Sequence, residues 1–250
     1  CIRLHTPGEW QNDQIAWHII EQQSQPNKNT RQDIIEQRLF CIFKKNIRIF
    51  GSGRTDAGVH ANNQVFHFDA DWEHGKDKLS LAIASGLPRS IRIKSVQETK
   101  NDFHAQFSVI KKRYTYHLLE GTANPFEYRF LWELKGKKLD IQKMNILAKE
   151  LTGTHDFAAF GAKRGNGENE CTIKTLYLLS FSRTMNYITL STEASGYLYK
   201  MVRTIVGTMI EVGIGTLSQE YVMECFRNRQ RKEKIVTAPA SGLFLDKVYY

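Results

Sequence analysis

The stretch Gly51-Ser52-Gly53-Arg54-Thr55-Asp56-Ala57-Gly58-Val59-His60 decides how the rest of the sequence is interpreted. Its three glycines enclose one arginine and one carboxylate. Residues 47–50 are mostly apolar and residues 64–68 alternate polar with apolar, so we expect a strand on each side. Glycine permits positive φ and close approach of the backbone. The decad is therefore a tight loop that either presses an Arg and an Asp against a ligand or simply connects two strands.

Length and charge narrow the class of protein. The chain has 250 residues, of which 41% are hydrophobic, enough for one large domain or two small ones. Lys and Arg outnumber Asp and Glu by 35 to 26, a net charge of +9, which favours a polyanionic partner: nucleic acid first, an anionic membrane second. No segment is long and apolar enough to span a bilayer, and residues 1–15 do not resemble a secretory signal. Four cysteines far apart in the sequence predict a reducing, cytoplasmic location without disulfides or a zinc site.

The order of expected elements predicts an α+β fold. The periodicity predicts helices over residues 30–44, 79–84, 141–151 and 197–212. Strands are expected over 15–20, 47–50, 64–68, 91–96, 103–119, 176–182, 187–190 and 242–250. Loops are expected over 120–130 and 153–160, with a mobile glycine-rich stretch at 163–169 and a basic run at 227–234. The two halves meet without a linker near Phe103, which predicts domains over 1–105 and 106–250.

Several kinds of chemistry are excluded by the motifs. Val59 and His60 stand where a phosphate-binding P-loop needs Lys and Ser or Thr, and no dinucleotide fingerprint, G-x-S-x-G or H-E-x-x-H occurs. The pair His60 and His67 is a weak metal site because no further ligand accompanies it. What remains is Asp56, one carboxylate on a rigid loop of a basic protein, which can act as a nucleophile or a base.

A buried carboxylate stays ionised only beside a cation, and two arginines are candidates. Arg54 lies two residues away, and Arg203 lies among apolar residues of the expected helix 197–212. Arg203 either lies at the solvent edge, which periodicity favours, or is buried with a partner. The segment Lys111-Lys112-Arg113-Tyr114-Thr115-Tyr116 alternates cations with aromatic rings, which suits phosphates and unstacked bases, or else is an edge strand with its rings packed inward.

Five motifs in order resemble those of the TruA family of tRNA pseudouridine synthases. The first is the loop itself, extended to Ala61. The others are Phe103–Ser108 followed by Arg113–Tyr116, Leu151–Phe157 with Phe160, Gly196–Gly207, and Ala238–Leu243. The N-terminal edge departs from the family pattern, because Gln14-Ile15-Ala16 and Glu21-Gln22-Gln23 stand where Tyr-x-Gly and aromatic-x-Gly-Trp-Gln are usual.

The resemblance implies an architecture and an activity. The architecture is two ferredoxin-like or RRM-like lobes that share one extended, mainly antiparallel sheet, with helices on one side and a central basic cleft. The activity is conversion of uridine to pseudouridine at positions 38, 39 and 40 of the tRNA anticodon arm by a homodimer, without metal or cofactor.

The resemblance also assigns roles to residues. Asp56 is implied to be the nucleophile, Arg203 its ion partner and Tyr114 the ring that stacks on the target uracil. Arg54 is implied to hold the displaced strand or the extruded nucleotide. The remaining substrate-binding residues are expected to be Gly53, Thr55, His60, Lys112 and Arg113.

Two other functions compete with this one. A non-catalytic tRNA-binding protein of the same fold would explain the altered N-terminal edge. A carboxylate-dependent hydrolase would pair Asp56 with a second acid such as Asp69 or Asp156, but the basic charge speaks against it.

Overall fold

The computed structural model describes residues 2–4, 17–19, 30–162 and 170–250, which form parts of two compact units. Unit 1 comprises residues 1–110 together with 245–250, and unit 2 comprises residues 111–244. The glycine-rich stretch 163–169 and the departures at 14–16 and 21–23 lie outside the described residues. The division into domains after residue 105 stays a prediction, because a compact set of contacts is a different property from independent folding.

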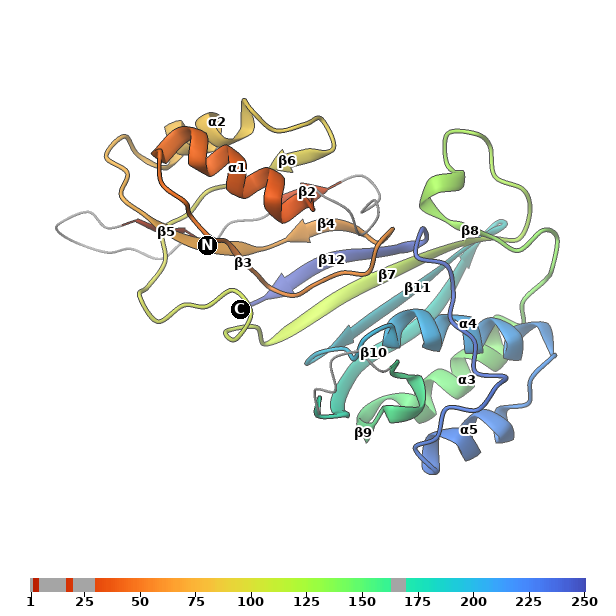
Figure 1. The fold of residues 1–250 in the computed structure, drawn as a ribbon. Helices are drawn as coiled ribbons and strands as arrows, with labels where there is room; N and C mark the ends of the chain where they lie inside the picture. Colours follow the sequence, from red (N-terminus) through yellow and green to blue (C-terminus); the bar gives the residue numbers. More distant parts are fainter. Residues whose placement is uncertain (1, 5–16, 20–29, 163–169) are drawn as a thin grey trace. The chain divides into compact units, whose positions relative to one another are not determined.

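Unit 1 contains two groups of strands (Figure 1). In the first, β5 (Phe66–Ala70) pairs in parallel with β1 (Ile2–Leu4) and antiparallel with β3 (Phe50–Gly51). The second has the order β6-β2-β4-β12. Its members are β6 (Ile91–Ile93), β2 (Trp17–Ile19), β4 (His60–Gln64) and β12 (Leu243–Tyr249), the last of which enters unit 1 at residue 245. The loop that carries Asp56 therefore leaves one group of strands at β3 and enters the other at β4.

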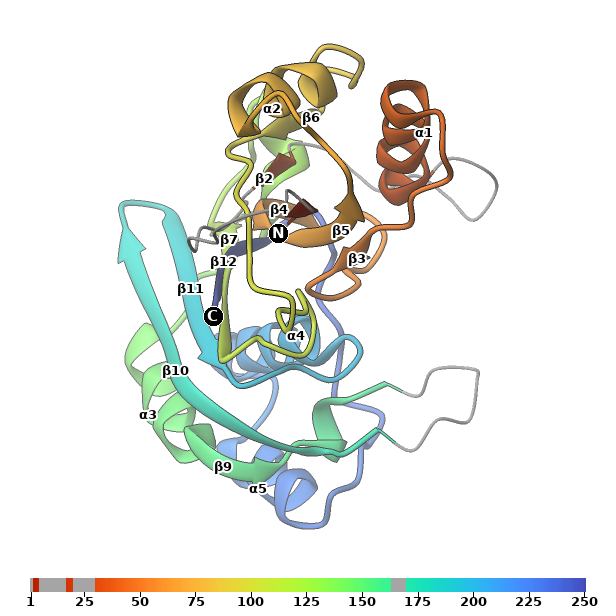
Figure 2. The same cartoon turned by 90° about the vertical axis from the view of Figure 1, so that its left-hand side faces the viewer.

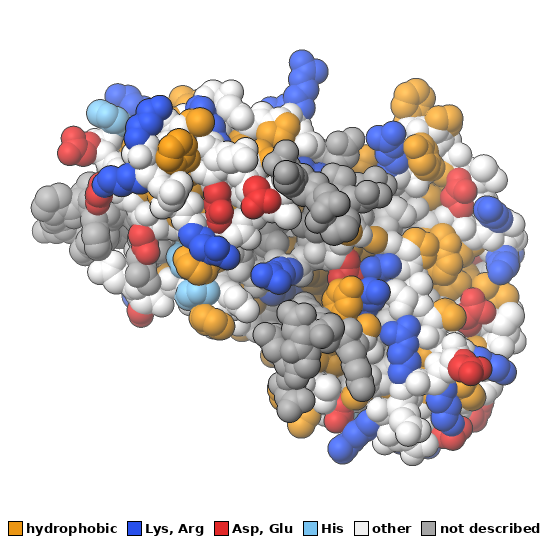
Figure 3. Space-filling view, viewed as in Figure 1, with side chains coloured by type: hydrophobic (Ala, Val, Ile, Leu, Met, Phe, Trp, Pro, Cys, Tyr) orange, Lys and Arg blue, Asp and Glu red, His pale blue; other side chains and the backbone are white. Residues whose placement is uncertain are grey.

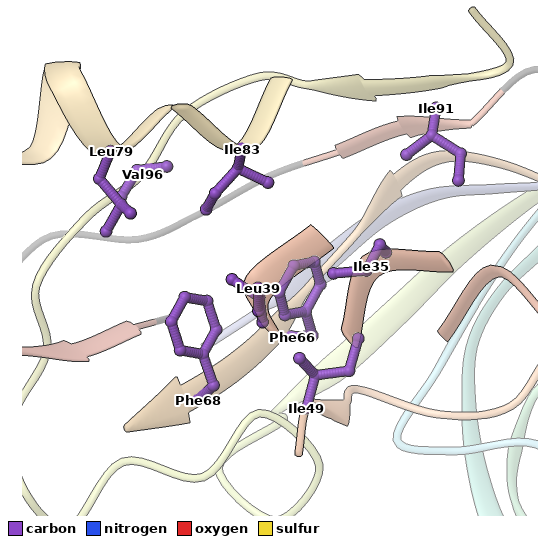
Figure 4. Packing of buried hydrophobic residues seen from close by; sticks show 9 residues of the cluster. All are labelled: Ile35, Leu39, Ile49, Phe66, Phe68, Leu79, Ile83, Ile91 and Val96. Carbon is purple, nitrogen blue, oxygen red and sulfur yellow. The ribbon is translucent and has the colours of Figure 1, made fainter. Parts of the chain in front are cut away.

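Two helices cover unit 1 (Figures 1 and 2). Helix α1 (Arg31–Phe43) begins at a capping box, in which the Asp33 N–H donates to the Thr30 hydroxyl and the Thr30 N–H donates to the Asp33 carboxylate. Helix α2 (Lys76–Ala84) follows β5. Figure 4 shows the core, in which side chains from both helices meet those of β5 and β6. It consists of Ile35, Leu39, Ile49, Phe66, Phe68, Leu79, Ile83, Ile91 and Val96.

Unit 2 has an antiparallel sheet with the order β7-β11-β10-β9, and three helices on one face of it (Figures 1 and 2). The strands are β7 (Lys111–Leu119), β11 (Tyr187–Ala194), β10 (Ile173–Thr184) and β9 (Gly153–Asp156), with β8 (Trp132–Glu133) parallel to β7. The helices are α3 (Ile141–Leu151), α4 (Met201–Ile214) and α5 (Gln219–Arg227), with 3-10 turns at Tyr128–Phe130 and Ala158–Phe160.

The α+β class, helices α1 and α3, and the hairpin of β10 and β11 confirm the sequence prediction. The strand expected over 103–119 is wrong in its first part, because residues 103–110 form turns. There the Ser108 N–H donates to the His104 carbonyl, and the His104 ring accepts two further backbone N–H groups. The loop expected over 153–160 contains β9.

Other elements also differ from the prediction. Helix α4 begins only at Met201, because Lys200 has a φ of +61°, and it extends to Ile214, with Gly215 rather than Gly213 as its C-cap. Residues 47–49 are extended without forming a ladder, and helix α5 was not expected. The shared sheet and the basic cleft stay predictions.

A buried carboxylate, Glu120, ties the end of β7 to the start of α3. It accepts hydrogen bonds from the Leu139 N–H at 2.8 Å, from the Lys138 ammonium at 3.1 Å and from the Arg183 guanidinium at 2.5 Å. Burial alone would raise the pKa of Glu120, but the Leu139 N–H and the two cations outweigh it and lower the pKa below 4.5. Its charge is therefore part of the folded structure at neutral pH.

We expect Glu120→Gln to destabilise unit 2 by about 2 kcal/mol at pH 7, because the Arg183 and Lys138 cations lose their anionic acceptor. Because the folded pKa is lowered, the contribution is present above pH 4.5 and is lost as the pH falls further. Urea unfolding at several pH values measures this. The exposed pair of Glu224 and Lys232 supplies the control, and Glu224→Gln should change the midpoint far less. Equal shifts for both variants would contradict the role of Glu120.

Candidate active site

The loop between β3 and β4 presents Asp56 on a tight turn. The Val59 N–H donates to the Asp56 carbonyl at 3.1 Å, so Asp56 is the first residue of a four-residue turn. Gly58, the third residue, has a φ of +84°, a conformation that glycine adopts without strain. The Asp56 side chain is half-buried, whereas Arg54 and Ala57 are exposed. The glycine thus permits the reversal that places the carboxylate at the surface of unit 1.

Gln64 fastens the beginning of this loop. Its amide donates to the Gly53 carbonyl at 2.9 Å, and its carbonyl oxygen accepts from the Ser52 hydroxyl at 2.5 Å. The Ser52 N–H donates in turn to the Val65 carbonyl at 2.7 Å. These bonds hold the chain immediately before Arg54 and Asp56. Gln64 was not predicted to belong to the site, because a polar side chain in an expected strand does not reveal that it turns back onto the loop.

The predicted binding residues of this loop take different positions. Gly53 and Thr55 are half-buried on either side of the exposed Arg54, whereas His60 is fully buried at the start of β4. The His60 ring is therefore closed to solvent, unlike the exposed side chain of Arg54. Contact of these residues with a substrate stays a prediction.

In unit 2, the basic and aromatic side chains of β7 lie on two faces of the sheet, because successive residues of a strand point to opposite sides. Lys111 and Arg113 share one face and both bind the buried carboxylate of Glu193 on β11, each at 2.6 Å. The hydrogen bond from Lys111 lowers the pKa of Glu193 most, and Arg113 lowers it further, whereas burial acts in the opposite direction. The predicted substrate contact of Arg113 thus belongs to a group that is already ion-paired.

The other face of β7 carries Lys112, Tyr114 and Tyr116. The Tyr114 ring meets the Tyr197 ring edge-on at 5.2 Å, and the Tyr197 hydroxyl lies 3.2 Å from the Thr192 hydroxyl. Tyr114 is half-buried and Tyr116 is fully buried. Inward packing therefore holds for the Tyr116 ring, and contact of the Tyr114 ring with an unstacked base stays a prediction.

The ammonium group of Lys112 has a lowered pKa. Burial, with a further contribution from the nearby cation of Lys174, lowers the pKa of Lys112 from 10.5 to about 8. The ammonium is therefore protonated at pH 7, yet it loses its proton far more easily than an ordinary lysine.

Arg203 lies in the first turn of α4 and is half-buried. Its Nε donates to the Ala238 carbonyl at 2.9 Å, and the Ala238 N–H donates back to the Arg203 carbonyl at 2.9 Å. The guanidinium is thus held by the segment that follows α5, which corrects the solvent-edge position that periodicity favoured.

The same segment also meets β7. The Tyr116 hydroxyl donates to the Pro239 carbonyl at 2.7 Å. Burial raises the pKa of Tyr116, and the positive charge of Arg203 opposes this increase. The segment therefore brings Arg203 close to Tyr116 within unit 2. Asp56 belongs to unit 1, so convergence of Asp56 with Arg203 and Tyr114 stays a prediction.

Other candidate chemistry finds less support. Asp156, considered as the second acid of a hydrolase, caps its own turn by accepting the Ala158 N–H at 3.0 Å and lies 3.5 Å from the Arg229 Nε. Within the described part of the chain, no three His, Cys, Asp or Glu side chains are placed to hold a metal ion. The cysteines there, Cys41, Cys171 and Cys225, form no disulfide. None of the helices described is long and apolar enough to cross a membrane.

Comparison with known proteins gives consistent matches over most of the chain. A model of the tRNA pseudouridine synthase family matches residues 12–108 and 147–250. The tRNA pseudouridine synthase A 1 of Protochlamydia amoebophila is 38% identical over 232 residues, which cover 91% of this chain and 90% of that protein. The tRNA pseudouridine synthase A of Bacillus subtilis is 36% identical over 231 residues, covering 91% and 92%. A chain of a Cbf5-Nop10-Gar1 complex matches 80% of this chain and 46% of its own length, with 12% identity and a TM-score of 0.35.

The close approach of α4 to the segment that holds Arg203 is testable through Gly207. A Cβ at this position would lie 2.7 Å from the Val236 carbonyl oxygen and 2.9 Å from the Ala238 nitrogen. We expect Gly207→Ala to lower the free energy of unfolding by roughly 1–3 kcal/mol, since backbone must move apart. Gly213→Ala in the same helix is the control, because its nearest obstacle is the flexible end of the Met144 side chain. A larger loss for Gly213→Ala in chemical unfolding would contradict this view.

Proposed function

The chain belongs to the tRNA pseudouridine synthase family, and on that premise we propose that it converts uridine to pseudouridine at positions 38, 39 and 40 of the tRNA anticodon arm. The family is one of isomerases, and the relatives that match about nine tenths of the chain are named for this modification of tRNA. Isomerisation of uridine in tRNA is therefore the activity of this enzyme. The anticodon arm and the roles of individual residues are the finer parts of the proposal.

Asp56 is the proposed nucleophile, and the turn that presents it is the observation that supports this most. A nucleophile must approach its target without backbone obstruction. The bond from the Val59 N–H and the positive φ of Gly58 fold the chain back behind Asp56. Because Gln64 holds the residues before it, little conformational freedom is lost when a nucleotide binds.

The reaction rearranges bonds within one nucleotide. The target uridine is stacked in the arm, so its base must first be extruded, which costs a few kcal/mol. The Asp56 carboxylate then attacks C1′ of the ribose or C6 of the ring, and the bond between N1 and C1′ breaks. The uracil rotates in the site, and a bond forms between C5 and C1′. The bond between Asp56 and C1′ or C6 breaks, which frees the carboxylate. C5 loses its proton to water, and N1 takes up a proton from water. No atom is gained or lost overall.

Arg203 and Tyr114 are proposed to complete the site from unit 2. Arg203 supplies the positive charge that keeps a desolvated carboxylate ionised. Its Nε bond to the Ala238 carbonyl supports this role, because it fixes the plane of the guanidinium. Tyr114 is proposed to stack on the extruded uracil, and its edge-on contact with Tyr197 limits the rotation of the ring.

Binding of the tRNA backbone is proposed to involve Arg54, Lys112 and Arg113. Arg54 is exposed beside Asp56, so it can enter the space that an extruded base leaves. The net charge of +9 supports phosphate contacts in general. A homodimer that shares each tRNA between its subunits, in the cytoplasm and without metal or cofactor, completes the proposal.

The nucleophile is tested with tRNA that carries tritium at C5 of its uridines. Wild-type protein should release tritium, because C5 loses its hydrogen when the new bond forms. Asp56→Asn should lower the rate by more than about a thousandfold. Asp69→Asn, an exposed carboxylate in the same unit, is the matched control and should keep the wild-type rate. If Asp56→Asn released tritium at the wild-type rate, Asp56 would not be the nucleophile.

A second prediction concerns pH and Lys112. Its pKa of about 8 means that the ammonium is charged at pH 7 and neutral at pH 9. We expect tRNA affinity to fall several-fold over this interval, because one phosphate contact is lost, and the salt dependence of binding should weaken by about one ion. Filter binding at fixed ionic strength measures both.

Lys112→Arg is the control for this effect, because the guanidinium stays charged throughout the interval. Lys174→Gln should move the fall in affinity to higher pH by removing the neighbouring cation. A pH profile that is the same for wild type and Lys112→Arg would contradict a phosphate contact of Lys112.

A further inference from the structure

We propose that Phe107, supported by His104 and Phe50, stacks on an unpaired base of the bound tRNA, and this inference rests on the proposed function. Phe107 is 78% exposed and Phe50 is 45% exposed, although both belong to the well-packed unit 1. The His104 and Phe107 rings are stacked with centroids 4.3 Å apart, and the Phe50 and His104 rings lie 5.7 Å apart. We call these three residues the ring platform.

The ring platform continues into buried rings, which fix its position. Phe50 stacks on the buried His67 at 5.2 Å, and His67 lies 4.6 Å from His104. The Tyr250 ring packs against Phe103 at 4.9 Å. An exposed ring that other rings hold in place offers contact area to a ligand, and little side-chain conformational entropy is lost when the ligand binds.

The backbone beneath Phe107 is also held in place. The His67 Nδ1 accepts the Ala105 N–H at 3.1 Å, and the Tyr250 hydroxyl donates to the Ala105 carbonyl at 2.7 Å. The His104 Nδ1 accepts the N–H groups of Gln106 and Phe107. His104 therefore carries its proton on Nε2, the nitrogen that does not face the turn. A rigid turn presents Phe107, as a stacking surface requires.

Charge around the ring platform favours a polyanion over an apolar protein partner. Arg48, Ile49 and Phe50 alternate exposed, buried and exposed, so Arg48 projects on the same side as Phe50. The Ile49 backbone is tied to α1 on both sides, because Gln32 donates to its carbonyl and its N–H donates to Glu36. On the face drawn in Figure 3, histidine side chains of unit 1 lie among hydrophobic ones, with a Lys or Arg beside them.

Cations next to an aromatic face are the combination that single-stranded RNA requires, since phosphates bind the cations and bases stack on the ring. The loop that follows Phe50 carries Asp56, so the ring platform lies at the entrance to that loop along the chain. A base stacked there would be a different nucleotide from the target, held while the target is extruded. The predicted occupant is therefore an unpaired base of the substrate tRNA.

Affinity for unmodified tRNA tests the proposal directly. We expect Phe107→Ala to raise the Kd about tenfold and Phe107→Leu to raise it nearly as much, whereas Phe107→Trp should bind like wild type. The slope of log K against log salt should stay the same in all three, because no phosphate contact is removed. Arg48→Gln should instead reduce that slope by about one.

Phe126→Ala is the matched control, because Phe126 is 89% exposed on unit 2 and lies outside the ring platform. Its Kd should equal that of wild type. An unchanged Kd for Phe107→Ala would overturn the proposal, as would full affinity of Phe107→Leu or an equal loss in Phe126→Ala. If Phe107→Ala instead lowers the molecular mass in sedimentation and keeps the Kd, the ring platform meets a second copy of the chain and the proposal fails.

Photocrosslinking supplies an independent readout. Ultraviolet irradiation of the complex with tRNA, followed by trypsin and mass spectrometry, should attach a nucleotide to the peptide Asn101–Lys111. The crosslink should disappear in Phe107→Ala, and its absence from wild type would overturn the proposal. Failure of the proposed function has a different signature, because wild-type protein would then release no tritium even where the crosslink forms.

Discussion

The segment from Val236 to Gly242 packs against both α4 and β7, so closely that glycine is required at the two points of contact. The arrangement of unit 2 depends on this close packing. At Gly207 the obstacle is the backbone of Val236 and Ala238, and at Gly242 it is the His117 carbonyl and the Tyr116 ring. Close approach brings the Ala238 carbonyl to Arg203 and the Pro239 carbonyl to Tyr116. An arginine in a helix and a tyrosine in a strand are thus fixed by one stretch of chain that belongs to neither.

Among the described residues of unit 2, the buried carboxylates Glu193 and Glu120 each bind two cations. Glu193 holds Lys111 and Arg113, and Glu120 holds Lys138 and Arg183. Pairing offsets the cost of burying the carboxylate and fixes long side chains that would otherwise be disordered. It also divides the basic residues by role, since Lys112 lies on the other face of β7, where burial lowers its pKa. Some cations of unit 2 are thus already ion-paired, so the net charge overstates the number that can bind RNA phosphates.

Local features were predictable from the sequence, and long-range ones were not. The capping box of Thr30 and Asp33, the helix 141–151 and the glycine turn before His60 each involve residues a few positions apart. The turn at 103–108 was not predictable, because it depends on the His104 ring accepting backbone N–H groups and on His67, which is 38 residues away from Ala105. Arg203 was misplaced for the same reason: its partner Ala238 lies 35 residues later.

Extruding a stacked uridine requires contacts that distinguish an extruded base from a stacked one. A phosphate contact persists in both states, so Lys and Arg strengthen binding without shifting the balance between them. An aromatic face contacts a base only after that base has left its stack, and each such contact contributes about 1–3 kcal/mol, comparable to the cost of extrusion. Salt weakens the phosphate contacts and leaves stacking largely intact. Under the proposed function, the ring that favours extrusion is therefore the one that receives the target base, Tyr114, which Tyr197 holds in place.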